Sequence, residues 1–422
     1  MSKRALNKSR DFPQNNLEEE NRMANRKANI LIVSIIAIFL IACVLASILP
    51  ATTYVAHADS GKKFETTGKS AYLVDYATGT VLYARNENER LPIASMVKIM
   101  TANLTLEAIE RGDITLDDDV LVSENAASMG GSQVFLDADS THKVSDLLRS
   151  VIVASANDSC VALAEHIDGS VQKFVARMNS RADELGMKNT HFVNCTGLPA
   201  PGGYSSAKDA SLMFAALIKH PTFLEYAKVW MEDYKHPSGR TTTISNTNKL
   251  VRFYKGCDGG KTGFTNEAKF CLTATAKRDN MRVIAVLIGA DSSQNRNAAV
   301  SQMFDYAFAN FENSVLKKAN EPIENTVEVL GGKKTTINLS INNDLTAFKE
   351  KNGNENYEVK YELPRAIKAP IRQGDVIGKA YLVKDGVVVK EEPIVAIDDV
   401  DRKSLFDAIK DIAAHWTTQI AK

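Results

Sequence analysis

The chain has 422 residues, of which 44% are hydrophobic and 24% charged, and its 51 Lys and Arg balance 51 Asp and Glu. A chain of this length has room for two or three domains. The zero net charge argues against a nucleic-acid binder, because such proteins carry an excess of Lys and Arg. The five cysteines form no C-x-x-C pair and no Cys/His cluster at zinc spacing. We therefore expect no metal site and no cofactor.

The N-terminal part of the chain carries an uncharged apolar segment over residues 30–49, preceded by three basic residues. Its length would suffice to cross a bilayer, and the basic flank predicts a cytoplasmic N-terminus. Ala56-His57-Ala58 is a small-x-small pattern typical of signal peptidase sites. We interpret residues 1–58 as a signal peptide cut after Ala58, with an uncleaved signal anchor or a lipid on Cys43 as alternatives. Each interpretation places residues 59 onward outside the cytoplasm.

The next part of the chain predicts strands, then a helical block, then strands again. Ala71–Asp75 and Thr80–Ala84 are strand-like and are joined by a turn signal. Helical patterns follow over Ser95–Gly112, Val144–Val161, Phe174–Leu185, Asp209–Ile218 and Asn297–Phe311. Later strands are expected over Asp258–Thr265, Phe270–Ala276 and Arg282–Ala290. Their short connections favour an antiparallel sheet, so we expect one α/β domain over residues 65–312.

The last quarter of the chain has a different pattern. Residues 313–400 alternate apolar and polar positions, and Asp385-Gly386 is a hairpin signal, so we expect a small all-β domain. Residues 401–422 predict a helix with an apolar stripe that contains Trp416. We favour a membrane anchor lying in the plane of the bilayer surface over a helix docked on its own domain.

Ser95 and Lys98 are the strongest chemical signal in the helical block. They stand three residues apart, after Pro92, at the start of an apolar helix, where this spacing puts both side chains on one face. Desolvation lowers the pKa of a lysine, so Lys98 could serve as the base for a Ser95 nucleophile. The S-x-x-K spacing alone is weak evidence, because it occurs at five other places in the chain.

Two further motifs support a catalytic role for Ser95 and Lys98. Ser155-Ala156-Asn157 interrupts an apolar helical pattern, where polar residues usually have a hydrogen-bonding role. Lys261-Thr262-Gly263 occurs once, on a predicted strand after two glycines. The informative feature is that the three motifs occur in this order along the chain: S-x-x-K on a helix, S-x-N in a mid-domain break, and K-T-G on a late strand. With a lysine as base, we treat the histidines, which are scattered along the chain, as structural.

The three motifs, the β-rich C-terminal region and the terminal amphipathic helix resemble the low-molecular-mass serine-type D-alanyl-D-alanine carboxypeptidases, a branch of the penicillin-binding serine enzymes. The resemblance covers nearly the whole mature chain and implies a penicillin-binding/β-lactamase-like domain followed by a small all-β domain. It implies a hydrolase that removes the terminal D-alanine from peptidoglycan stem pentapeptides and is acylated by β-lactams. Such an enzyme works in cell-wall maturation, at the outer face of the cytoplasmic membrane or in the cell wall.

The resemblance also implies catalytic roles for Ser95, Lys98 and Ser155, and a binding role for Asn157. Ser95 Oγ attacks the carbonyl between two D-alanines, and Lys98 takes its proton. Ser155 relays the proton to the departing amine. Asn157 holds either the substrate amide or the Lys98 side chain.

The remaining implied site residues bind substrate. The strand of Lys261, Thr262, Gly263 and Phe264 takes the acyl peptide edge-on. Lys261 and Thr262 face the terminal carboxylate, and Arg296 lies where the family often places a carboxylate-binding arginine. The backbone N–H groups of Ser95 and Phe264 meet the oxyanion.

Other functions share parts of this pattern. A DD-endopeptidase or transpeptidase has the same acylation half and differs in the acceptor. A β-lactamase is disfavoured because the E-x-x-L-N run expected between the second and third motifs is absent. A non-catalytic wall-binding scaffold would not need all three motifs intact.

Overall fold

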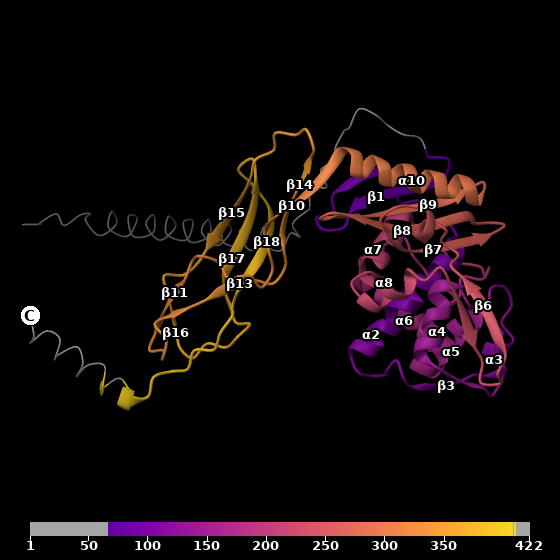
Figure 1. Ribbon diagram of the computed structural model, residues 1–422, viewed down its shortest axis with the longest axis horizontal. Helices are drawn as coiled ribbons and strands as arrows, with labels where there is room; N and C mark the ends of the chain where they lie inside the picture. The colour runs from indigo at the N-terminus through magenta and orange to yellow at the C-terminus, as the bar shows by residue number, and fades with distance from the viewer. Residues whose placement is uncertain (1–65, 408, 411–422) are drawn as a thin grey trace, which may run out of the picture. The chain divides into compact units, whose positions relative to one another are not determined.

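The structure is a computed structural model in which residues 66–407 and 409–410 are described (Figure 1). The predictions for residues 1–58 lie outside this part of the chain, as does most of the predicted helix at 401–422. Within the described part, no helix combines the length and the hydropathy needed to cross a bilayer.

A five-stranded antiparallel sheet organises the first domain, with strand order β2-β1-β9-β8-β7. The strands are β1 (Ser70–Asp75), β2 (Val81–Arg85), β7 (Cys257–Thr265), β8 (Lys269–Arg278) and β9 (Met281–Ala290). All five were expected from the sequence, and the antiparallel prediction is confirmed. Pairing of β1 with β9 joins the two ends of the domain at the centre of the sheet, while β7 forms one edge.

Helices cover both faces of this sheet (Figure 1). One face packs against α10 (Ser293–Asn310), whose Val300, Met303 and Phe304 are fully buried. The other face packs against the helical block. Its members are α2 (Lys98–Glu110), α3 (Glu124–Ala127), α4 (Val144–Val153), α5 (Asn157–Asp168), α6 (Val171–Glu184), α7 (Ala207–Leu217) and α8 (Pro221–Ala227). The short α9 (Leu250–Phe253) packs on the α10 side, where Leu250 is buried in the same cluster as Phe304.

Two of the predicted helices differ in detail from the sequence pattern. The helix expected from Ser95 begins with a 3₁₀ turn, η1 (Ala94–Val97), before α2, and α2 is buried on nearly all sides. The pattern over Val144–Val161 divides into α4 and α5, and Ser155 lies in the break between them. The interruption read from the polar residues is therefore confirmed.

Two short antiparallel strand pairs were not expected. β3 (Asp119–Leu121) pairs with β4 (Thr141–Lys143) across a connection that contains α3, and β5 (Met231–Lys235) forms a hairpin with β6 (Thr241–Ser245). Each strand of the β5–β6 hairpin buries one residue, Tyr234 or Ile244, so its apolar pattern is too short to read.

The second domain is built from strands, which confirms the β-rich prediction. They are β10 (Phe311–Lys317), β11 (Val327–Leu330), β12 (Thr336–Ile337), β13 (Leu339–Ile341), β14 (Leu345–Glu350), β15 (Tyr357–Glu362), β16 (Ala366–Lys368), β17 (Val376–Lys384) and β18 (Val387–Ala396). Asp385-Gly386 forms the predicted turn between β17 and β18. The four cysteines in the described part, Cys160, Cys195, Cys257 and Cys271, are buried free thiols.

Candidate active site

The junction of η1 and α2 brings Ser95 and Lys98 together. Lys98 Nζ lies 3.1 Å from Ser95 Oγ and donates a hydrogen bond of 2.6 Å to the Thr196 carbonyl. The lysine is 0% exposed, and this burial lowers the pKa of its amine below the ordinary value. A neutral amine at this distance has a lone pair able to accept the serine proton.

Close backbone packing fixes the turn that carries Ser95. Ala94, the residue before it, has φ +47. A Cβ at Gly197 (φ +78) would lie 2.1 Å from the Ala94 carbonyl oxygen, and one at Gly263 would lie 2.4 Å from the Ile93 oxygen. Both positions need glycine because the backbones touch there. The third motif thus supports the first through its glycine.

Ser155 and Lys261 form a second serine–lysine pair. Lys261 Nζ donates to Ser155 Oγ at 2.8 Å and to the Thr262 carbonyl at 3.2 Å. Burial lowers the pKa of Lys261 well below its ordinary value, and the positive charges of Lys98 and Arg296 lower it further. Ser155 has φ +65, an uncommon conformation for a residue with a side chain, and it is only 3% exposed. The structure therefore joins the second motif to the third directly.

Asn157 has one amide atom bound and one left without a partner. Its Nδ2 donates to the Gly130 carbonyl at 2.6 Å, and its backbone N–H donates to the Ser132 carbonyl at 2.7 Å. Its buried Oδ1 has no hydrogen-bond partner within the part of the chain that the structure describes. No bond joins it to Lys98 among those residues, so the alternative in which Asn157 holds Lys98 is not what the geometry shows. A buried free acceptor is costly, and it suits a substrate N–H.

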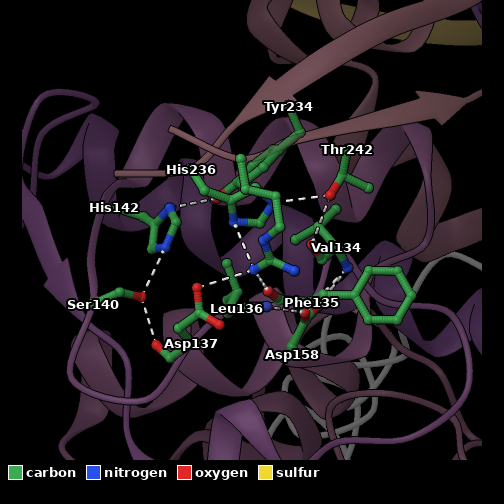
Figure 2. Close-up of polar contacts among 11 residues, drawn as sticks. Val134, Phe135, Leu136, Asp137, Ser140, His142, Asp158, Tyr234, His236 and Thr242 are labelled. Carbon is green, nitrogen blue, oxygen red and sulfur yellow. Dashed lines mark hydrogen bonds and ion pairs between the residues drawn. The ribbon is translucent and has the colours of Figure 1, made fainter. Parts of the chain in front are cut away.

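The backbone of residues 130–137, named here the flanking segment, is held on two sides (Figure 2). The buried Asp158 carboxylate accepts the N–H groups of Val134 and Leu136, both at 3.1 Å. From the β5–β6 turn, Arg240 donates to the Phe135 carbonyl and, at 3.0 Å, to the Asp137 carboxylate. The flanking segment is therefore tied both to the helix that begins at Asn157 and to the β5–β6 hairpin.

Two histidines take part in contacts at this hairpin: His236 lies in its turn, directly after β5, and His142 lies on β4. The Tyr234 hydroxyl lies 2.8 Å from His142 Nδ1, and Ser140 Oγ lies 3.0 Å from His142 Nε2 (Figure 2). His236 Nε2 lies 2.9 Å from Thr242 Oγ1. Burial lowers the pKa of both His142 and His236, so the neutral forms are favoured. Two of the histidines that are far apart in the sequence thus converge in one hydrogen-bonded cluster.

The other predicted binding residues lie on β7 and α10. Thr262 is 8% exposed, whereas Phe264 is 52% exposed and packs on Phe270 with ring centroids 4.4 Å apart. Arg296, in the first turn of α10, is only 5% exposed, and its Nε and Nη2 both donate to Asn297 Oδ1 at 3.0 Å. Burial lowers the pKa of Arg296 to about 10. Its charge reaches Lys261, but its guanidinium is directed to a neighbouring side chain.

Several residues that shape the site were not identified from the sequence. The Thr196 carbonyl has no sequence signal, because every residue carries one. Asp158 had a readable signal, since an acid directly after Asn157 stands in an otherwise apolar helical stretch. Arg240 and Gly197 act through contacts with distant segments. No group of three His, Cys, Asp or Glu side chains within the described residues could hold a metal ion.

Comparisons with known proteins agree with this geometry. The D-alanyl-D-alanine carboxypeptidase family model matches residues 55–292, and the penicillin-binding protein 5 C-terminal domain matches residues 311–402. The chain is 42% identical over 351 residues to the D-alanyl-D-alanine carboxypeptidase DacF of Bacillus subtilis, covering 83% of this chain and 90% of that protein. It is 32% identical over 347 residues to DacC of Escherichia coli, covering 80% of this chain and 86% of that one.

Solved structures give the same assignment. Penicillin-binding protein 5 from Haemophilus influenzae aligns with a TM-score of 0.66 at 32% identity, covering 81% of this chain and all (100%) of that one. Penicillin-binding protein 3 from Streptococcus pneumoniae aligns with a TM-score of 0.67 at 27% identity, covering 80% and 100%. The chain therefore belongs to the low-molecular-mass penicillin-binding proteins and is a serine-type D-Ala-D-Ala carboxypeptidase that acts in peptidoglycan maturation.

Proposed function

We propose that Ser95 is the nucleophile, that Lys98 is its base, and that Ser155, Asn157 and the β7 residues complete the site for a stem peptide ending in D-Ala-D-Ala. The observation that carries this proposal is the fully buried Lys98, whose Nζ lies 3.1 Å from Ser95 Oγ and whose pKa is lowered by burial. An uncharged base is needed before a serine hydroxyl can attack a carbonyl.

Acylation follows from these positions. Ser95 Oγ bonds to the carbonyl carbon of the first D-alanine while its proton passes to Lys98. The N–H groups of Ser95 and Phe264 stabilise the negative oxygen. When the C–N bond breaks, the proton returns through Ser155 to the departing amine. The resulting ester on Ser95 is then hydrolysed by water, which releases the shortened peptide.

Binding follows from the second pair of residues. Lys261 and Thr262 face the carboxylate of the departing D-alanine. An anion there favours the protonated form of Lys261, which burial alone disfavours. Asn157 Oδ1 accepts a substrate N–H, which removes its missing hydrogen bond. Gly263 lets the peptide-binding strand approach the turn of Ser95. Arg296 contributes positive charge from behind β7 and is not proposed as a direct ligand in the free enzyme.

The enzyme family implies β-lactams as covalent inhibitors, and we propose Ser95 as the residue they acylate. We also propose that residues 1–58 export the chain, that residues 65–312 and 313–400 are its catalytic and β-rich domains, and that residues 401–422 hold it at the outer face of the membrane. Truncation before Asp401 should then move the protein to the soluble fraction. Unchanged partitioning would contradict the anchor and leave the N-terminal segment as the attachment.

The test of the activity uses the detergent-extracted full chain and a peptide ending in D-Ala-D-Ala. We expect release of free D-alanine and labelling by a fluorescent penicillin, and neither with Ser95→Ala. Ser314→Ala, at another S-x-x-K spacing on β10 of the second domain, is the matched control and should keep both signals. Labelling without D-alanine release would point instead to an endopeptidase or transpeptidase, and absence of labelling would contradict the proposed nucleophile.

A further inference from the structure

Two series of hydrogen bonds end on carbonyls of the flanking segment, and each passes through a buried histidine (Figure 2). The first passes through His142. Ser140 Oγ donates to the Asp137 carbonyl at 2.5 Å, so its oxygen accepts from His142 Nε2, which lies 3.0 Å away. His142 Nδ1 keeps its lone pair, which accepts a hydrogen bond of 2.8 Å from the Tyr234 hydroxyl. This arrangement requires a neutral ring at His142.

The second series passes through His236. Arg240 Nη2 lies 3.4 Å from His236 Nδ1, and a guanidinium can only donate, so Nδ1 is the acceptor. The proton of the neutral ring is therefore on Nε2, which donates to Thr242 Oγ1 at 2.9 Å. Thr242 Oγ1 in turn donates to the Val134 carbonyl at 3.4 Å. Each histidine thus acts on the flanking segment through one hydroxyl group.

A proton added to either ring would place an N–H where these bonds need a lone pair. At His236 the new N–H would face Arg240, so that two donors and two positive charges would oppose each other. At His142 it would face the Tyr234 hydroxyl, which would have to turn its own hydrogen away. Within the described residues this hydroxyl makes no other hydrogen bond, so the hydrogen would lose its acceptor.

The charged groups around the two rings do not remove this cost. Arg240 disfavours a positive charge on either ring, and His236 disfavours one on His142, whose ring centroid is 5.9 Å away. Three carboxylates favour such a charge: Asp137 in the flanking segment, Asp146 on α4 and Asp158 on α5. Burial dominates, and the pKa of each histidine lies below its ordinary value. The rings therefore gain protons only in acid.

The flanking segment in turn holds Asn157. The Gly130 carbonyl accepts from Asn157 Nδ2 at 2.6 Å, and the Ser132 carbonyl accepts from its backbone N–H at 2.7 Å. These two bonds aim the amide group whose buried Oδ1 is left without a partner among the described residues. The orientation of that free acceptor therefore depends on where the backbone of the flanking segment lies.

We propose that His142 and His236 are positioning residues for the carboxypeptidase reaction. As neutral rings they hold the flanking segment, and through it Asn157, in the geometry that binds the peptide. When they gain protons, the segment loosens and the affinity for the peptide falls. The effect on affinity rests on the substrate-binding role proposed for Asn157, whereas the effect on the segment does not.

The first measurement follows the segment directly, by hydrogen exchange and mass spectrometry of the detergent-extracted full chain. It is made at about pH 5 and about pH 7.5, on either side of the ordinary histidine pKa, and corrected for the intrinsic exchange rates. In acid we expect the protection of residues 130–137 to fall by about three- to tenfold, the effect of one hydrogen bond, while β8 keeps its protection.

Two variants assign this change to the histidines. The double variant His142→Gln, His236→Gln gains no charge in this pH range and should show equal protection of residues 130–137 at both pH values. His220→Gln is the matched control, because His220 is also buried but bonds to Glu110 rather than to the hairpin. It should behave as the wild type. If the double variant does not fold, the wild type and the single variant His236→Gln decide the question.

The second measurement follows the reaction, as kcat and KM for D-alanine release from a peptide ending in D-Ala-D-Ala. Titration of Lys98 affects the wild type and the double variant alike, so it cancels in their ratio. Toward about pH 5 the KM of the wild type should rise about three- to tenfold relative to that of the double variant, the effect of one lost hydrogen bond to substrate. The ratio of their kcat values should change little.

Three results would overturn the proposal. They are equal protection of residues 130–137 in the wild type at both pH values, a double variant that loses protection in acid as the wild type does, and a loss of protection without the relative rise in KM. Absence of D-alanine release by the wild type at either pH would count against the proposed function instead. Hydrogen exchange would then still decide whether the two histidines hold the segment.

Discussion

The two sides of the catalytic site are held in place by different forces. On one side, η1, α2 and β7 meet through glycine contacts, and their two lysines are buried. On the other side, the flanking segment is held by hydrogen bonds to Asp158 and to Arg240, whose side chain is 41% exposed. The buried side fixes the reacting atoms by steric contact, which allows little adjustment. The flanking segment depends instead on polar bonds to one buried carboxylate and one exposed guanidinium.

The largest effect is expected from Lys98→Met, which removes the base and keeps the volume of the side chain. Acylation by a fluorescent penicillin should slow by about 10²- to 10⁴-fold, the usual contribution of a positioned base. The fold should persist, because an apolar group replaces a buried amine. Thermal unfolding of the variant is the control. An acylation rate within twofold of the wild type would show that another group takes the Ser95 proton.

The pH dependence of acylation also tests the buried side of the site, through the pKa of Lys98. Burial lowers the pKa of Lys98, and the base works only when neutral, so the rate should rise with pH and level off below the ordinary lysine pKa of about 10.4. Between the lowered pKa and about 10.4 the unfolded chain binds more protons at this site. The unfolding free energy of the wild type, relative to Lys98→Met, should therefore rise with pH in that interval. A difference in unfolding free energy that does not change with pH would mean that the pKa of Lys98 is not lowered.

Gly197→Ala tests the backbone contact beneath Ser95. Positive φ costs an alanine about 1–2 kcal/mol, and the overlap with the Ala94 oxygen adds about 1–3 kcal/mol. Gly202→Ala is the matched control, because Gly202 has φ +85 but its nearest neighbour to a new Cβ is 3.9 Å away. Chemical denaturation should show the larger loss of unfolding free energy for Gly197→Ala. Equal losses would mean that the turn gives way to the added methyl group.

Asp158→Asn tests the hydrogen-bonded side. The amide oxygen can take the place of Oδ2, which accepts both N–H groups of the flanking segment. The amide NH2 group then stands where Oδ1 accepts the Ser159 N–H at 2.9 Å, so unfolding free energy should fall by about 1–3 kcal/mol. We expect KM for the peptide to rise more than kcat falls, because Ser95 and Lys98 stay in place. A loss confined to kcat would contradict the separation of the two sides.

Arg240→Ala should give the smallest effect. Its ion pair with Asp137 is exposed, and such pairs contribute about 0–1 kcal/mol. The stability difference from the wild type should shrink further in high salt, which screens exposed charges. Asp233→Ala, on the same hairpin, serves as the control for general loss of surface charge. A large loss of unfolding free energy that high salt leaves unchanged would mean that Arg240 acts through buried contacts, like the residues on the other side of the site.

The sequence allowed prediction of the parts of the site that depend on local patterns. The start of the Ser95 helix, the break at Ser155 and the β7 strand each have a short signature that determines its own conformation. The flanking segment could not be placed, because its conformation depends on Asp158 and on a hairpin about a hundred residues later. Residues 231–245 carry only two buried side chains in their strands, too few for a period to be seen.

The second limit concerns pairings between distant segments. Nothing in Ala71–Asp75 specifies β9 as its partner, and a strand with buried residues on both faces offers no preferred edge. The Ser95–Lys98 pair was easier, since the family resemblance supported what the spacing alone left weak. The bond from Lys261 to Ser155 was not predicted. Neither the residue pattern nor the family resemblance predicted a cavity beside Ser95. It is lined by residues 92–97, 191–204 and 265–267, three segments that share no motif.

The pairing of β1 with β9 also determines when the enzyme becomes active. Ser70 pairs with Ile288, so β1 cannot pair with β9 until nearly all of the domain has been synthesised. Contacts between such distant residues form slowly. A chain that stops before Met281 carries Ser95, Lys98 and Lys261, but it has no β9 to join the β7–β8 hairpin to β1. The complete catalytic site can therefore form only after β9 has been synthesised, and shorter nascent chains lack it.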